Sequence, residues 1–153
     1  MQPKEHIFYG GLFAMACYFL LPVVGSYEAF VIWIATWFII DLDHAIFYSV
    51  KTLNFNPVKF WKWSKHHRER WLRIPGHKKR ELQHPIYIFH GIEALVVLFL
   101  LGLKWDVFHW VLIGFVFHLI LDWIHMCYLD EDIMYKVSWI WVLFRNRGKL
   151  KFL

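Results

Sequence analysis

Residues 105–129 read WDVFHWVLIGFVFHLILDWIHMCYL, and this stretch decides the fold. A helix needs about 20 mainly apolar residues to cross the hydrocarbon core of a bilayer, and this run is long enough. Three ionisable residues, His118, Asp122 and His125, interrupt it at spacings that place them on one face of a helix. A long apolar helix with one polar stripe is typical of a membrane protein with a site in its interior.

Three other segments, 6–21, 27–50 and 85–103, are apolar over a comparable length. The short connections around Pro22 and Gly102 predict two helical hairpins. We therefore expect an all-α integral membrane bundle of about four transmembrane helices, forming one domain over residues 1–153. Residues 130–145 combine Trp and Phe with basic residues, which predicts an interfacial amphipathic helix.

Composition supports the membrane assignment. Hydrophobic residues make up 59% and aromatic residues 21% of the 153 residues, whereas apolar residues make up about 45–50% of an ordinary soluble domain. A soluble chain of this length cannot enclose ten Trp and fifteen Phe in one core. Cys17 and Cys127 both lie in apolar runs, which argues against a disulfide framework. The N-terminus lacks a cleavage-site pattern, so we expect the first run to be retained as a helix.

The basic residues predict the topology. Ten of the 17 Lys and Arg lie between Lys51 and Arg80, and five more lie between Lys136 and Lys151. A basic cluster can mark a nucleic-acid site, but beside membrane spans it more often marks the cytoplasmic side. We expect a cytoplasmic loop over residues 51–84 and cytoplasmic termini, in the inner or plasma membrane. Trp and Phe alternate with Lys and Arg in this loop, which favours contact with anionic membrane lipids over nucleic acid.

The costly ionisable residues fall at one predicted depth. At about 1.5 Å per helical residue, four segments place them in a single layer near the cytoplasmic face. The layer contains His6, Asp41, Asp43, His44, His84, His90, Glu93, His118, Asp122 and His125. A lone intramembrane His often makes only a hydrogen bond between helices. A whole layer of such residues is expensive without a metal ion or a water-filled cavity, which favours a functional site.

Imidazole together with carboxylate predicts a divalent metal, zinc first, with manganese or iron as further choices. The predicted ligands are His6, Asp41, Asp43, His44, His84, His90, His118 and Asp122. They are too many for one ion, which indicates two ions, or one ion with an acid/base shell. Asp41 and Asp43 would point apart on a regular helix, so either one meets another polar group or the helix is irregular there. Glu93 and His125 are candidate general acids or bases, and Glu93 could instead orient a ligating His.

Four short elements occur in a recognisable order: His6, then Asp41-Leu42-Asp43-His44, then His84 and His90, then His118-x-x-x-Asp122. This order, over most of the chain, resembles the small inner-membrane metal-dependent hydrolases of the LexA-regulated type, a family distantly similar to zinc-dependent phospholipase C. The resemblance implies a metal-dependent hydrolase that uses these residues as ligands.

We therefore expect a membrane-embedded hydrolase of a phosphoester or other bond in an anionic, lipid-like substrate. A bound divalent ion would lower the pKa of a water molecule toward roughly 7 and so supply the nucleophile. A transporter of metal ions or protons would use the same Asp and His residues. It would need polar groups reaching the outer face, where the sequence offers little beyond Glu28, Lys104, Asp106 and His109. Haem binding and a purely structural role account less well for clustered carboxylates.

Overall fold

The computed structural model of the chain describes residues 3–79, 81–129 and 131–149. The predictions for both chain ends, for Arg80 and for Asp130 therefore lie outside the described residues. The described chain is all-α, as predicted. Its elements in order are α1 (Pro3–Leu20), α2 (Ser26–Ile34), the π-helical turn η1 (Ala35–Ile39), α3 (Leu42–Thr52), α4 (Pro57–Leu72), α5 (Gly76–Lys79), α6 (Ile92–Gly102), α7 (Val107–Tyr128), the 3-10 turn η2 (Ile133–Lys136) and α8 (Trp139–Arg145).

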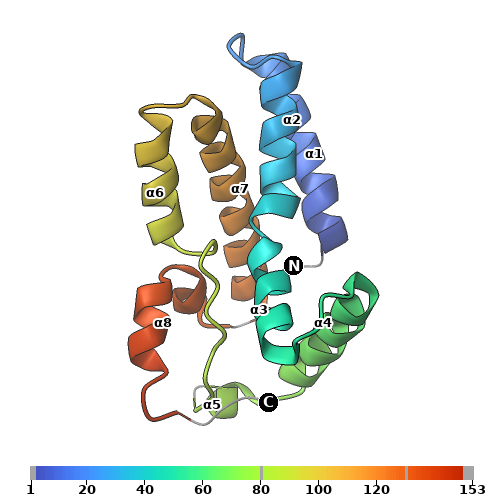
Figure 1. Cartoon of the computed structure of the whole chain (residues 1–153), viewed down its shortest axis with the longest axis vertical. Helices are drawn as coiled ribbons and strands as arrows, with labels where there is room; N and C mark the ends of the chain where they lie inside the picture. Colours follow the sequence, from blue (N-terminus) through green and yellow to red (C-terminus); the bar gives the residue numbers. More distant parts are fainter. Residues whose placement is uncertain (1–2, 80, 130, 150–153) are drawn as a thin grey trace.

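The upper half of the molecule consists of two helical hairpins, α1–α2 and α6–α7, whose turns lie at the same end (Figure 1). Helix α7 packs against both α2 and α6, and α1 packs against α2. One buried cluster joins Ala35 and Ile40 to Phe115 and Leu119 of α7. The two hairpins confirm the interpretation of the short connecting turns.

Gly114 permits the close crossing of α7 over α2. A Cβ atom at Gly114 would lie 2.6 Å from both the Ile32 carbonyl oxygen and the Ala35 Cβ. Neither atom belongs to a flexible side chain, so only glycine fits here. His118 follows one turn later and is thereby brought against η1.

The bundle exposes many large apolar side chains and buries a cluster of polar ones beside its apolar core. Phe8, Phe19 and Ile124 are 61%, 73% and 62% exposed, whereas His118 and Asp122 are 0% and 1% exposed. Two helices are long and apolar enough to cross a membrane: the continuous segment Ser26–Thr52 of 27 residues, and Val107–Tyr128 of 22 residues. The four predicted spans therefore reduce, by this criterion, to two within the described residues.

The predicted helix over residues 85–103 is wrong in its first part, because regular helix begins only at Ile92. Residues 83–91 instead form an extended strap that rises from the lower half to α6 (Figure 1). Side chains distant in sequence satisfy its backbone: Asn146 Oδ1 accepts from His84 N at 2.9 Å, and Asp43 Oδ2 accepts from Phe89 N at 3.0 Å. Helix α6 is about 16 Å long at 1.5 Å per residue, roughly half the hydrocarbon thickness.

The lower half contains α3, α4, α5, η2 and α8 (Figure 1). The stretch predicted as a basic loop is largely the helix α4, which begins after Asn56 because its side chain accepts from Val58 N and Lys59 N. Pro57 at the first helical position adds to this start signal. The predicted single amphipathic helix over 130–145 is two short pieces, η2 and α8. The predicted helix 27–50 lies within the helical run Ser26–Thr52, and the run is irregular at Ile40 and Asp41, one of the two alternatives predicted there.

Candidate metal centre

The site lies where the two hairpins meet the lower half, and each contributing element ends or begins there. Helix α1 supplies His6 in its first turns, and α7 supplies His118 and Asp122. The break between η1 and α3 supplies Asp41 and Asp43, and the strap supplies His90 just before α6. Most residues of the predicted polar layer thus come together, although His90 reaches the site from an extended segment and not from a helix.

The π-helical turn η1 fixes the orientation of His118. The Thr36 carbonyl oxygen accepts a hydrogen bond from His118 Nδ1 at 2.6 Å. A π-helical turn lies outside the regular i to i+4 pattern, and such turns are frequent at functional sites. The carbonyl oxygen can only accept, so Nδ1 carries a proton, and the other ring nitrogen, Nε2, faces Asp122, with Nε2 and Oδ2 3.2 Å apart.

His90 is oriented in the same way by a carboxylate. Its Nδ1 lies 3.0 Å from Asp43 Oδ2, and that oxygen also accepts from the backbone N–H of Phe89. The other oxygen of Asp43 is 2.8 Å from His44 Nδ1. His90 Nε2 is buried and has no hydrogen-bond partner among the described residues. Asp43 therefore orients His90, as carboxylates commonly orient metal-binding imidazoles.

The Nε2 atoms of His90 and His118 converge on two carboxylates. His90 Nε2 is 3.5 Å from Asp41 Oδ1 and 3.8 Å from Asp122 Oδ2. His118 Nε2 is 3.9 Å from Asp41 Oδ1. Ligand atoms at 2.0–2.1 Å from a tetrahedral zinc ion stand about 3.3 Å apart. Imidazole nitrogens and carboxylate oxygens at such spacings are held together by a proton or a cation between them, and the spacings of this donor set fit a divalent ion.

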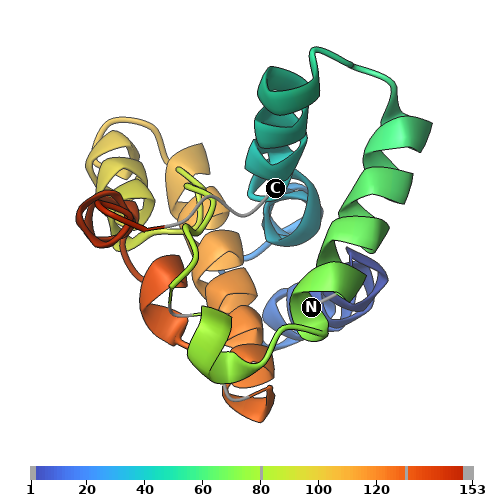
Figure 2. The same cartoon turned by 90° about the horizontal axis from the view of Figure 1, so that it is seen from below.

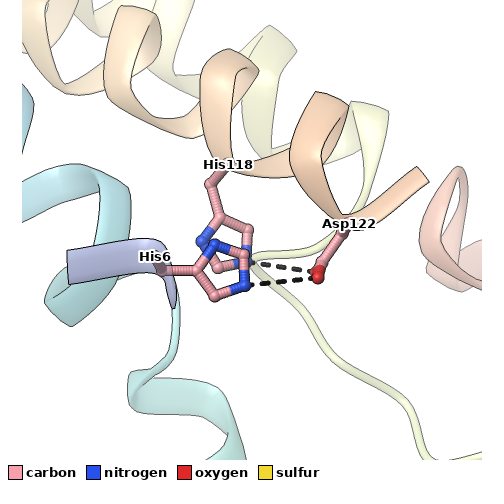
Figure 3. A group of neighbouring side chains, drawn as sticks. All are labelled: His6, His118 and Asp122. Carbon is pink, nitrogen blue, oxygen red and sulfur yellow. Dashed lines mark hydrogen bonds and ion pairs between the residues drawn. The ribbon is translucent and has the colours of Figure 1, made fainter. Parts of the chain in front are cut away.

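His6 completes the cluster from the first helix. Its ring stacks on that of His118 with centroids 3.9 Å apart, and its Nε2 lies 3.3 Å from Asp122 Oδ1 (Figure 3). The described residues contain three overlapping groups able to hold an ion: His6–His118–Asp122, Asp41–His90–His118 and Asp43–His44–His90. Seven of the eight predicted ligands belong to these groups, and His84 does not.

His84 lies apart from the cluster. It stacks on Tyr135 with centroids 4.0 Å apart and meets the edge of Trp71. Burial, together with the positive charges of Arg145 and Lys149, lowers its pKa to about 3. The imidazole is therefore neutral at physiological pH, and its position indicates a packing role.

The two candidate acid/base residues are separated by the fold. Glu93 accepts from Ser138 Oγ at 2.5 Å and from the backbone N–H groups of Trp139 and Ile140 at 3.4 and 3.3 Å, so it caps the start of α8. His125 lies on the same side of α7 as Asp122, and its Nε2 is 2.9 Å from Arg68 Nη2. Only His125 is placed beside the cluster.

Lys136 is the site residue that sequence reasoning missed. Its ammonium group donates to Asp122 Oδ2, the oxygen that also faces His118. Lys136 was grouped with the interfacial segment because nothing in the local pattern marks it. Lys136 reaches Asp122 because the chain folds back after α7 and packs η2 against it.

A cavity of about 360 Å³ opens onto the cluster. Asp41, His44, Asp122 and Lys136 line its inner part, and α4 contributes aromatic and basic side chains opposite. The α4 residues on this wall are Phe60, Trp61, Trp63, Ser64, Lys65, His67, Arg68, Trp71 and Leu72. Burial and the nearby charges of Lys51 and Arg70 lower the pKa of His67 to about 4, so this wall histidine is neutral.

Comparison of the chain with protein-family models, curated proteins and solved structures finds no match. The case for function therefore depends on the geometry: buried imidazoles with fixed tautomers, facing carboxylates, and a cavity of ligand size beside them.

Proposed function

We propose that this protein is a membrane-embedded, metal-dependent hydrolase of an anionic, lipid-like substrate, as its resemblance to the LexA-regulated hydrolase family implies. One observation carries the proposal: the Nε2 atoms of His90 and His118, with Nδ1 already engaged, converge on Asp41 and Asp122. An apolar exterior around this buried polar cluster favours a lipid environment.

Zinc is the ion that suits this donor set best. His90, His118 and Asp122 would hold it, with His6 as an alternative ligand, and Asp41 would lie beside it. Asp43 would act through His90, and Thr36 through His118. Manganese and iron are compatible with the same ligands. The group Asp41–His90–His118 shares His118 with one of the other two groups and His90 with the other, which favours a single ion over two.

The divalent ion, when bound, would polarise a phosphoryl or carbonyl oxygen and activate water near neutral pH. The chain's own residues have separate tasks. Asp41, whose side chain is 24% exposed, borders the cavity and is placed to take a proton from an attacking water molecule. His125 also borders the cavity, and its Nε2 accepts from Arg68, so it is placed to orient that guanidinium group. The Trp-rich wall of α4 excludes bulk water from this region.

The transporter alternative requires a polar path through the upper bundle. Within the described chain, the buried polar residues are His6, Thr36, Asp43, His84, His90, His118 and Asp122. Above them, the buried residues between the hairpins are apolar, including Val111, Phe115 and Ile32. A site closed on one side by an apolar core favours catalysis at one membrane face over passage across it.

Metal analysis of the protein purified in detergent tests the proposal. We expect about one zinc per chain, and His118→Ala or Asp122→Ala should remove most of it because an incomplete ligand set binds poorly. His66→Ala, an exposed position on α4, serves as the matched control and should keep the metal.

Activity separates the two candidate functions. Protein in liposomes should hydrolyse an anionic amphiphile only with metal present, and Asp41→Asn should abolish turnover. A wild-type protein that binds no zinc would overturn the proposal. Metal-ion or proton flux that Asp41→Asn eliminates, without hydrolysis across a broad lipid panel, would establish the transporter instead.

A further inference from the structure

Two cationic side chains enter the cavity from different walls. Lys136 comes from η2 and Arg68 from α4, and both line the cavity that contains Asp41 and Asp122. Viewed from below, α4 and the η2–α8 segment lie on opposite sides of the lower part of α7 (Figure 2). The two cations therefore reach the cavity from different elements of the fold.

Helix α7 sets the separation between them. Lys136 contacts Asp122, and Arg68 Nη2 is 2.9 Å from His125 Nε2. His125 follows Asp122 by three residues, a rise of about 4.5 Å on the same side of the helix. A group a few ångströms across, such as a phosphate, can therefore reach both cations.

Lys136 is held in place by the elements around it. The Val137 carbonyl oxygen accepts from Ile92 N at 2.8 Å, and the Lys136 carbonyl oxygen accepts from Trp123 Nε1 at 3.4 Å. Glu93 fixes the following Ser138. The role of Glu93 is thus to anchor the segment that carries the lysine, which makes it a positioning residue for the site.

Arg68 has the geometry for a phosphate. A guanidinium group presents five N–H donors in a planar fork, and His125 Nε2 takes one of them. The fork matches two phosphate oxygens at once, which a lysine cannot do. Lys65, one turn earlier on α4, lines the same cavity and adds a third positive charge.

The carboxylate on this wall does not cancel these charges. Glu131 also lines the cavity, but its Oε1 is bound by Lys79 Nζ at 2.8 Å and by Trp71 Nε1 at 3.0 Å. The other lining carboxylates, Asp41 and Asp122, belong to the candidate metal centre. Lys136 is itself paired with Asp122, so Arg68 and Lys65 bring the further positive charge to the cavity beside the candidate metal centre.

We infer that Lys136 and Arg68 form a subsite for a terminal phosphate group, so that the substrate class is a phosphomonoester. This inference rests on the proposed function and specifies its substrate. A terminal phosphate carries up to two negative charges and suits two cations beside a divalent ion better than a singly charged diester. In the reaction, water adds to phosphorus and the P–O bond to the alcohol breaks. One water proton passes to the alcohol, and the products are the alcohol and hydrogen phosphate.

Inorganic phosphate is the direct probe of this subsite. Its affinity for zinc-loaded protein in nanodiscs, measured by calorimetry, should fall about 10- to 100-fold in Arg68→Gln and in Lys136→Gln, as expected for loss of a charge-assisted hydrogen bond. Lys62→Gln removes the same charge from an exposed position of α4 outside the cavity and should leave the affinity unchanged. Zinc content should stay constant in all three variants.

The two sources of a phosphomonoester are distinguished by substrate. Phosphate release from vesicles containing phosphatidic acid is compared with release from glycerol phosphate in solution, and KM should rise in Arg68→Gln for whichever one is cleaved. Normal zinc content with equal phosphate affinity in the wild type and in Arg68→Gln would overturn the inference and leave the proposed function intact. Absence of zinc from the wild type would instead overturn the proposed function, while phosphate binding to the cationic pair could still be measured.

Discussion

In His90 and His118, a hydrogen bond from one ring nitrogen determines how the other ring nitrogen is oriented. His118 gives its Nδ1 proton to a backbone carbonyl, and His90 gives its own to Asp43. The other nitrogen of each ring, Nε2, then points into the core, where that of His118 faces Asp122 and that of His90 has no hydrogen-bond partner among the described residues. Burial of a polar atom without a partner costs free energy, and a cation among these atoms removes that cost.

Asp43→Asn tests the orienting role at this scale. The amide keeps the shape of the carboxylate but loses its charge, and its NH2 group cannot accept from His44, His90 or Phe89. We expect zinc affinity to fall about 10- to 100-fold, the usual effect of losing such a partner, while the fold is retained. Competition with a chelator of known affinity measures the change.

The control for Asp43→Asn is Asp106→Asn, an exposed position at the start of α7. It makes the same chemical change away from the site and should leave zinc affinity as in the wild type. Equal zinc affinity in Asp43→Asn and Asp106→Asn would show that Asp43 does not act on the metal centre.

At the scale of elements, the site depends on how closely α7 approaches α2 and η1. A Cβ atom added at Gly114 would lie 3.2 Å from the backbone N of Thr36. The carbonyl oxygen of the same Thr36 accepts the hydrogen bond from His118 Nδ1. The same crossing therefore controls both bundle packing and the orientation of one ligand. Backbone atoms cannot rotate away as a side-chain tip can, so an added methyl group must move a helix.

Gly114→Ala should destabilise the protein by about 1–3 kcal/mol, the usual cost of overpacking, and should also weaken zinc binding by displacing His118. Gly11→Ala is the matched control, because its Cβ would meet only Trp33 Nε1 at 3.5 Å, an ordinary contact. Alanine there should be neutral or should stabilise α1 by up to about 1 kcal/mol. Thermal unfolding in detergent gives both values, and equal melting temperatures for the two variants would contradict the packing argument.

The stability of the lower half of the molecule should fall as the pH is lowered. His84 packs between Tyr135 and Trp71, and burial with nearby positive charge lowers its pKa to about 3. An unfolded histidine titrates near 6.5. Between these values the unfolded state binds more protons, so the stabilising contribution of neutral His84 is present above pH 6.5 and is lost as pH falls toward 3.

His84→Gln removes this titration. We expect the wild type to lose more stability than His84→Gln between pH 7.5 and pH 5, measured by denaturant unfolding with chelator present in both samples. His66→Gln, at an exposed position of α4, should behave like the wild type. Parallel losses in the wild type and His84→Gln would show that His84 does not contribute to acid sensitivity.

Across the whole molecule, the sequence predicted which residues gather at the site better than it predicted the secondary structure that carries them. The i, i+4 spacing of His118 and Asp122 predicted their shared face correctly, because both lie on a long regular helix. His90 was expected on a helix, since apolar strap residues such as Ile86 and Phe89 look the same in either conformation. The strap is extended because Asp43 and Asn146 bond its backbone, and contacts so distant in sequence leave no local pattern.

The roles of Glu93 and Lys136 were missed for the same reason. Glu93 was close in sequence to His90 and was therefore expected at the site, yet it binds Ser138, 45 residues away. Lys136 reaches Asp122 only after the chain turns back beside α7. The residue type and its spacing in the sequence indicate which chemistry a side chain can perform. Its contacts with residues distant in sequence depend on the tertiary fold.

The distribution of basic residues predicts how the molecule is oriented in the membrane. The turns of both hairpins lie at one end, and the basic helix α4 lies in the opposite half, with the metal centre between them (Figure 1). Positive charge is retained on the cytoplasmic side, so α4 and the cavity should face the cytoplasm and the α6–α7 turn the outside. Single cysteines at exposed positions, Lys65 of α4 and Lys104 of the turn, report on the two ends.

Both variants are made in a background in which Cys17 and Cys127 are replaced by Ala. A membrane-impermeant maleimide should label Lys104→Cys in intact cells and Lys65→Cys only after permeabilisation. The reverse pattern would place the cavity outside and exclude a substrate in the cytoplasmic leaflet. Labelling of both sites in intact cells would contradict the membrane assignment itself, because a bundle that leaves Phe19 and Ile124 exposed needs lipid to cover them.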